Sequence, residues 1–153
     1  MKKLVYSIVS IISLLCLASC AQDEKLILDP DNFVASSWKQ TFDDVFVLDK
    51  NAAETDLAVI EWTPAQFGYD AIISDAIQLA VKKEGVDIND LTYTTFAITN
   101  ENKYTVKVKD LNAALLSAGA IKRRPTDIVM RVEATISTAY ASLTSSISEF
   151  NVT

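Results

Sequence analysis

Apolar and polar residues alternate along much of the chain with the period of β-strands. In residues 57–62 this alternation places Ile60 and Trp62 on one side and Val59 and Glu61 on the other, which predicts a half-buried strand with Trp62 facing inward. Short strands separated by turns indicate an all-β sandwich. Alternation or strand-favouring composition predicts further strands at residues 45–48, 91–98, 104–108, 127–137 and 146–152.

Residues 110–119 carry the pattern of one short helix. Leu111 and Leu115 share a face, and Asp110 is placed to cap the first turn by accepting backbone N–H groups. Gly119 can adopt the left-handed conformation that ends a helix.

Residues 71–85 fit two patterns. A helical stripe and a strand alternation can both be drawn through the apolar positions, so periodicity leaves helix and strand open at this point.

The first residues have the pattern of an export signal. Lys2 and Lys3 precede an apolar run over residues 4–17, which is too short to span a bilayer. The run ends in a motif that resembles the box of bacterial lipoproteins, in which the cysteine is lipidated and becomes the first mature residue. We therefore expect a lipoprotein signal peptide over residues 1–19, and the alternative is an ordinary signal with a chance cysteine. The box consists of Leu17, Ala18, Ser19 and Cys20.

Cysteine usage fits this expectation. Cys16 lies in the part to be removed, so Cys20 would be the single cysteine of the mature chain and could form no internal disulfide. Several acyl chains on its sulfur would anchor the protein stably to a membrane.

An acidic patch, Asp23 and Glu24, follows the lipobox. It resembles the signal that sends lipoproteins of some glycan-degrading Gram-negative bacteria to the cell surface; the alternative is a solvated tether that leaves the protein facing the periplasm. We expect a lipidated tether over residues 20–32 and one domain over residues 33–153.

The net charge of the chain limits the classes of molecule that it can bind. The net charge is −6, and loss of Lys2 and Lys3 with the signal makes the mature chain more acidic. An acidic domain repels phosphate backbones, so we expect no nucleic-acid partner.

The sequence lacks residue types that common catalytic sites require. The chain has no histidine, and lipid would block Cys20, which excludes triads of the Ser-His-Asp and Cys-His kinds. The acid-rich segments at residues 29–32 and 87–90 lack the pattern of a calcium loop and are better explained as turns. We expect no catalytic residue, no metal and no cofactor, and hence a protein that is not an enzyme.

Exposed aromatic rings can stack on sugars. Trp38 and Tyr69 are the candidates for such contacts, with Trp38 the ring expected to be more exposed. Phe67 and Tyr69 flank Gly68, and the competing interpretation is that both rings fix this loop onto the sandwich.

Several of these segments together resemble the amino-terminal domain of SusE-like outer-membrane lipoproteins, of the starch-utilisation type. The resemblance covers about residues 20–153. It rests on a strand ending in Trp62, the turn Thr63-Pro64, the segment Phe67-Gly68-Tyr69, the helix from Leu111 to Gly119, and the strand that begins at Thr126.

The resemblance implies an immunoglobulin-like sandwich and a strand at residues 73–82. It also implies a non-catalytic, lipid-anchored spacer and docking module of a glycan-uptake system in the outer membrane, facing the cell surface beside a glycan importer and its glycan-binding partner lipoprotein. Members of the family continue into carbohydrate-binding modules, whereas this chain stops at Thr153, so no sugar-binding residue is carried over.

Two alternatives remain. The chain could be a stand-alone module that binds a polysaccharide through exposed aromatics, or a lipid-anchored adhesin or fibre subunit that exchanges its final strand, residues 146–152.

Overall fold

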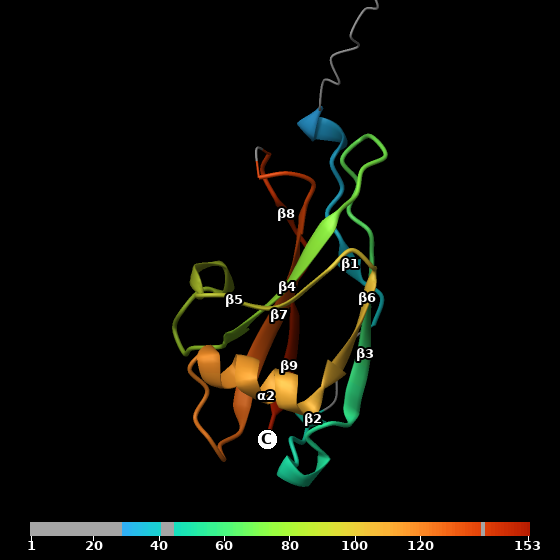
Figure 1. Cartoon of the computed structure of the whole chain (residues 1–153). Helices are drawn as coiled ribbons and strands as arrows, with labels where there is room; N and C mark the ends of the chain where they lie inside the picture. The colour runs from blue at the N-terminus through green and yellow to red at the C-terminus, as the bar shows by residue number, and fades with distance from the viewer. Residues whose placement is uncertain (1–28, 41–44, 139) are drawn as a thin grey trace, which may run out of the picture.

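The computed structural model describes residues 29–40, 45–138 and 140–153. Two β-sheets pack against one another, and one α-helix is present in this part of the chain (Figure 1). One sheet has the strand order β1-β3-β6, and the other has the order β2-β9-β7-β4-β5, with β8 paired to β7. The elements are β1 (Ser37–Trp38), β2 (Val45–Phe46), β3 (Asp56–Thr63), β4 (Ser74–Val81), β5 (Thr94–Thr99), β6 (Lys103–Lys107), α2 (Val108–Ser117), β7 (Thr126–Thr135), β8 (Leu143–Thr144) and β9 (Ser148–Val152), with 3-10 turns at Pro30–Asn32, Lys50–Ala52 and Ile88–Asp90.

The strand order confirms the predicted all-β sandwich. β3 pairs with β6 in one sheet, whereas β4, β7 and β9 adjoin in the other. β2 runs parallel to β9, and the remaining pairs are antiparallel. This division of strands between two sheets is that of immunoglobulin-like domains. The predicted signal peptide lies outside the described residues.

The alternation in β3 and β7 produces the expected faces. Ile60 and Trp62 are buried while Val59 is exposed. Ile128, Met130 and Val132 of β7 are buried in the same cluster, which lies between the sheets. Alternate side chains point to opposite faces of a strand, so the hydrophobic pattern fixes which face meets the other sheet.

The ambiguous segment is a strand, as the resemblance implied. β4 pairs along one edge with β5 and along the other with β7. Ile77 and Leu79 face the space between the sheets, and Ala80 is buried on the opposite face. A central strand that is buried on both faces reads as a nearly continuous apolar run, which explains why periodicity alone did not distinguish it from a helix.

The helix begins two residues earlier than expected. Asp110 is not its N-cap, because α2 starts at Val108 and follows β6 directly, with no side-chain cap. The N–H groups of Val108 and Lys109 donate instead to the backbone carbonyls of Thr55 and Ala53, at 3.2 and 3.0 Å. These distant carbonyls satisfy donors that a cap residue would otherwise take. Asp110 lies in the first turn, where a negative charge is favourable.

The helix terminates in the predicted way: α2 ends at Ser117, and Gly119, whose φ is +95°, is the left-handed residue that follows. The N–H of Gly119 donates to Leu116 and that of Ala120 donates to Leu115, the two bonds of a Schellman motif.

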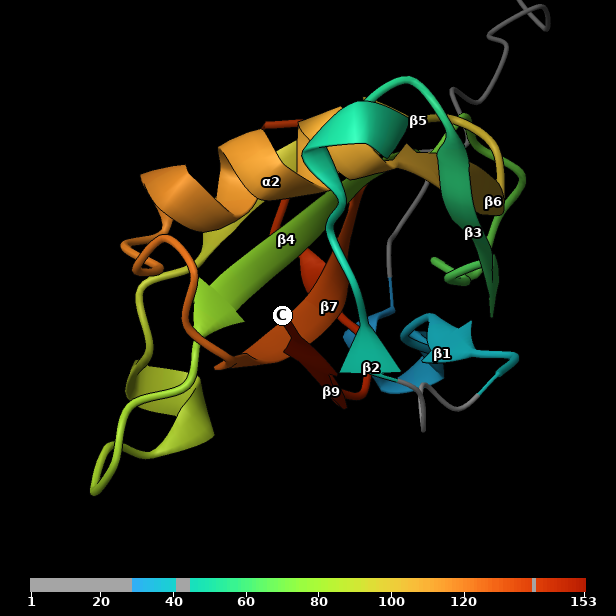
Figure 2. The ribbon, with the colours of Figure 1, turned by 90° about the horizontal axis from the view of Figure 1, so that it is seen from below.

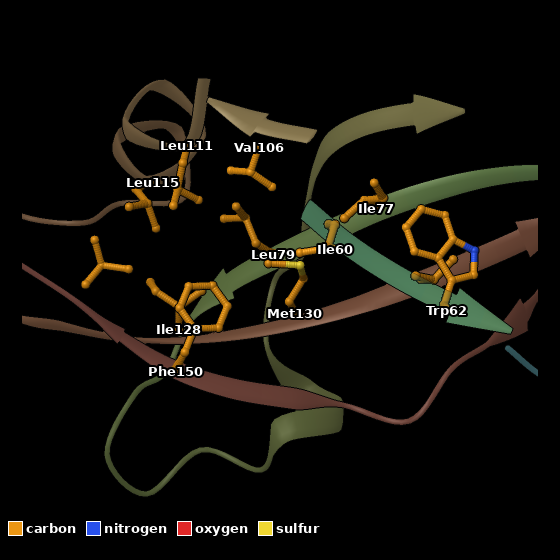
Figure 3. Packing of buried hydrophobic residues seen from close by; sticks show 12 residues of the cluster. Ile60, Trp62, Ile77, Leu79, Val106, Leu111, Leu115, Ile128, Met130 and Phe150 are labelled. Atoms are coloured by element: carbon orange, nitrogen blue, oxygen red, sulfur yellow. The ribbon is translucent and has the colours of Figure 1, made fainter. Parts of the chain in front are cut away.

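The core fills the space between the two sheets and under α2 (Figure 3). Leu111 and Leu115 of the helix lie at one end of this cluster, and Trp62 lies at the other. Trp62 is fully buried, as the alternation predicted.

One hydrogen bond connects the two sheets inside this core. The indole Nε1 of Trp62, on β3, donates to Oδ2 of Asp75, on β4, at 2.8 Å. Asp75 is only 2 % exposed, and its Oδ1 has no hydrogen-bond partner. Burial raises the pKa of the Asp75 carboxyl above its ordinary value, and the bond from Trp62 partly opposes this rise.

The raised pKa of Asp75 predicts a pH-dependent stability. Below the ordinary value of 3.8 the carboxyl is protonated in both folded and unfolded chains, so its ionisation costs nothing. As pH rises through the higher pKa of the folded state, the folded chain loses the advantage of burying this carboxyl in its neutral form. We therefore expect the free energy of unfolding of the wild type, relative to that of Asp75→Asn, to fall between acidic and neutral pH in denaturant titrations.

Asp90→Asn is the matched control, because that carboxyl is exposed and folding removes little water from it. A stability difference between the wild type and Asp75→Asn that stays constant with pH would contradict the prediction.

Candidate functional site

The first described residues lie at one end of the sandwich, which we call the tether end (Figure 1). Residues of three segments at this end line a groove of about 690 Å³. Its walls come from Asn32, from the β3–β4 loop over residues 64–73, and from Asn100 and Asn102 of the β5–β6 turn. The polar lining consists of Asn32, Gln66, Tyr69, Asp70, Asn100 and Asn102.

The β3–β4 loop is held in place by its own buried residues. Phe67 is 1 % exposed, and its ring packs edge-on against Phe33 with the centroids 5.2 Å apart. Val34 and Gln66 exchange two backbone hydrogen bonds of 2.9 and 2.8 Å. Gly68, at a φ of +78°, makes the turn that follows, a conformation that favours glycine. The groove is therefore lined by a fixed loop.

The opposite wall is also anchored. The backbone N–H of Trp62 donates to the carbonyl of Asn102 at 3.1 Å. The N–H of Glu101 donates to Oγ1 of Thr99 at 3.0 Å, which closes the turn. Both walls are consequently attached to the end of β3.

The groove offers hydrogen-bonding groups and almost no charge. Within the described chain, the side chains of Gln66, Asn100 and Asn102 have no hydrogen-bond partner, and none of the residues that line the groove is lysine or arginine. Asp70 is its one carboxylate. Such a lining can donate to and accept from a neutral polar ligand.

The structure separates the two predicted sugar-stacking candidates. Tyr69 is half-buried and lines the groove. Trp38 lies elsewhere: it is half-buried, its ring packs edge-on against Trp62 at 5.9 Å, and its Nε1 donates to the carbonyl of Ser146 at 3.0 Å.

The lipidation and export residues fall outside the described part of the chain. These are Leu17, Ala18, Ser19, Cys20, Asp23 and Glu24. Their roles stay predictions.

In the acid-rich loops, aspartate carboxylate oxygens accept hydrogen bonds from backbone N–H groups of the same turn. Asp29 accepts from the N–H of Asp31 at 3.2 Å, and Asp87 accepts from that of Asn89 at 2.8 Å, so each side chain closes its own turn. Over the described residues, no group of histidine, cysteine, aspartate and glutamate side chains is arranged to hold a metal ion. Nor does a helix in that part have the length and apolar character needed to cross a membrane.

A second hollow, of about 560 Å³, lies at the opposite end, beside α2 and the C-terminus. Figure 2 looks onto this far end, with α2, β2 and the C-terminus in view. Exposed Val47 and Ile121 line it together with the basic turn of Lys122, Arg123 and Arg124. The cations therefore lie on the end that does not hold the polar groove.

Sequence reasoning found Tyr69 but missed the rest of the groove. The sequence places Asn32 in the predicted tether and in an acid-rich turn, and it gives no reason to connect Asn32 with Asn100 or Asn102. No pattern within a single segment signals that three separate loops meet.

Comparison with known proteins completes the assignment. A family model described as SusE outer membrane protein matches residues 22–133, which contain the polar residues of the groove, the helix and most of the strands. No curated protein and no solved structure matches the chain. Since the match covers well over half of the sequence, the chain belongs to the SusE family of outer membrane proteins.

Proposed function

We propose that this SusE-family protein is a lipid-anchored, non-catalytic spacer and docking module of a glycan-binding and uptake system of the starch-utilisation type. The observation that carries the proposal is that the chain enters the sandwich at one end and finishes at the other. The first described residues and the C-terminus lie at opposite ends (Figure 1). A domain with this geometry holds what lies at its far end away from the point of attachment.

The attachment would be the lipid on Cys20. Eight residues lie between Cys20 and Asp29, and the nine Cα–Cα steps that connect the two residues reach at most about 30 Å. The tether would therefore keep the tether end of the sandwich near the membrane surface.

Rigidity supports the spacer role. Both cysteines precede residue 29, so packing replaces a disulfide in the described domain. The central strand β4 pairs over its full length with β7, and the Trp62–Asp75 bond connects the sheets. A module built in this way keeps a constant distance between its two ends.

The absence of histidine from the sequence supports a non-catalytic role, because the commonest general base at neutral pH is not available. The role of the domain is then carried by its shape and its surfaces.

Cys20→Ser tests the anchor. We expect the wild type in the outer-membrane fraction of its native host and the variant to be lost from that fraction, because the serine oxygen cannot carry the thioether-linked lipid. Cys16→Ser is the matched control, since that cysteine lies within the predicted signal peptide and its loss should leave the distribution unchanged. Retention of Cys20→Ser in the outer-membrane fraction at the wild-type level would refute lipid anchoring at this residue.

Replacement of Asp23 and Glu24 by Asn and Gln tests the direction in which the anchored protein faces. We expect the variant to stay in the outer membrane but to become protected from a protease added to intact cells. Asp31→Asn, in the predicted tether but outside the patch, should leave the wild-type sensitivity unchanged. Equal digestion of the patch variant and the wild type would remove the patch from the export signal.

Docking is tested by domain replacement. We expect a porin-type importer to copurify with the tagged wild type from detergent-solubilised membranes. The importer should be lost when residues 33–153 are exchanged for an unrelated immunoglobulin-like sandwich on the same tether. If the exchanged protein retains the importer, the domain surface has no part in docking.

A further inference from the structure

We infer that the groove at the tether end binds a neutral glycan, with Tyr69 as the stacking ring and the amides of Asn100 and Asn102 as hydrogen-bonding groups. This inference deepens the proposed function and rests on it for the kind of system in which the ligand is met. The site itself follows from the shape, the charge and the free polar groups of the groove.

Size is the first argument. The groove measures about 690 Å³, which lies inside the range of roughly 300–1,000 Å³ typical of sites for small molecules. Its walls are fixed before any ligand arrives, by the buried Phe67 on one side and by the bond from Trp62 to Asn102 on the other. A preformed site loses less conformational entropy on binding.

Charge is the second argument, and it excludes the main competing ligands. No lysine or arginine lines the groove, and Asp70 contributes a negative charge. An anionic glycan or a lipid phosphate would meet repulsion from Asp70 with no cation in this lining to offset it. The basic turn at Lys122–Arg124 could serve an anion, but it lies at the other end of the sandwich.

The third argument is the match between the groups that face the groove and those of a sugar. Each carboxamide of Gln66, Asn100 and Asn102 offers one acceptor oxygen and one donor NH₂ group. A sugar hydroxyl both donates and accepts, so neighbouring hydroxyls can bond to such amides in either sense. An apolar ligand would leave these groups unpaired, at a cost.

The fourth argument is the apolar surface beside these amides. Tyr69 is half-buried, so its ring is supported from beneath while part of it stays open. Ile72 is 82 % exposed in the same lining, and Pro64 of this lining is also exposed. The C–H face of a pyranose can pack on such a ring while its hydroxyls reach the amides. Neither a wholly polar nor a wholly apolar ligand uses both parts of this lining.

The experiment uses the full chain, extracted from membranes in detergent. Its retardation is measured in native gels that contain a linear α-glucan, a β-glucan, a mannan or a xylan, with polygalacturonate as the anionic probe. We expect retardation by at least one neutral glycan and none by polygalacturonate. Retardation by no neutral glycan, or by polygalacturonate alone, would overturn the inference.

Variants then locate the site. Tyr69→Ala should weaken binding about tenfold, because it removes the stacking ring, whereas Tyr69→Phe should bind nearly as well as the wild type. Asn100→Ala lies in an exposed turn and should weaken binding roughly threefold, the value of one hydrogen bond. Tyr140→Ala is the matched control, an exposed tyrosine that does not line the groove.

The outcomes separate this inference from the proposed function. Glycan binding that survives Tyr69→Ala and Asn100→Ala but is lost in Trp38→Phe would place the site elsewhere and reject the groove. Loss of binding in the groove variants, with membrane anchoring and importer copurification unchanged, supports the groove alone. A wild type that docks and binds no glycan retains the spacer role and rejects the inference.

Discussion

The hydrogen bond from the Trp62 indole to the Asp75 carboxylate is the contact on which the rest of the molecule depends. It crosses the interior from one sheet to the other at 2.8 Å. The bond fixes the orientation of Trp62, and Trp38 packs edge-on against that ring. A carboxylate in this position is costly, because burial raises its pKa and one of its oxygens has no partner. The hydrogen bond that joins the two sheets is therefore accepted by a carboxyl group whose charge depends on pH.

The same bond determines where the groove lies. Trp62 is near the end of β3 and Asp75 near the start of β4, so the loop over residues 64–73 begins and finishes at one contact. The backbone of Trp62 also holds the carbonyl of Asn102, in the opposite wall. A single core residue therefore positions both walls. This arrangement explains how surface loops can keep a fixed hollow without a disulfide or a metal in the described domain.

The sequence predicted those features that one segment determines by itself. Alternation placed Trp62 inside, and Gly119 ended the helix, because side-chain direction and left-handed φ are local properties. It failed at the start of α2, where carbonyls some fifty residues away replace the cap that Asp110 was expected to provide. It also gave no sign of the groove beyond Tyr69, since that site exists only where three loops meet. Asp75 interrupts the apolar run of residues 71–85, and only its partner across the sandwich explains why it is buried.

The two ends of the domain differ in chemistry in a way that fits their proposed surroundings. Most of the surface charge is negative, yet the basic turn at Lys122–Arg124 gathers three cations beside exposed Val47 and Ile121 at the far end. If the chain is anchored at Cys20, this end faces away from the bilayer and its anionic headgroups. The end that the proposed anchor would keep close to the membrane is the one with no cation in the lining of its groove. A cationic surface that faced the lipid would attract the sandwich to the membrane. With the basic turn at the far end instead, the sandwich is free to stand away from the membrane.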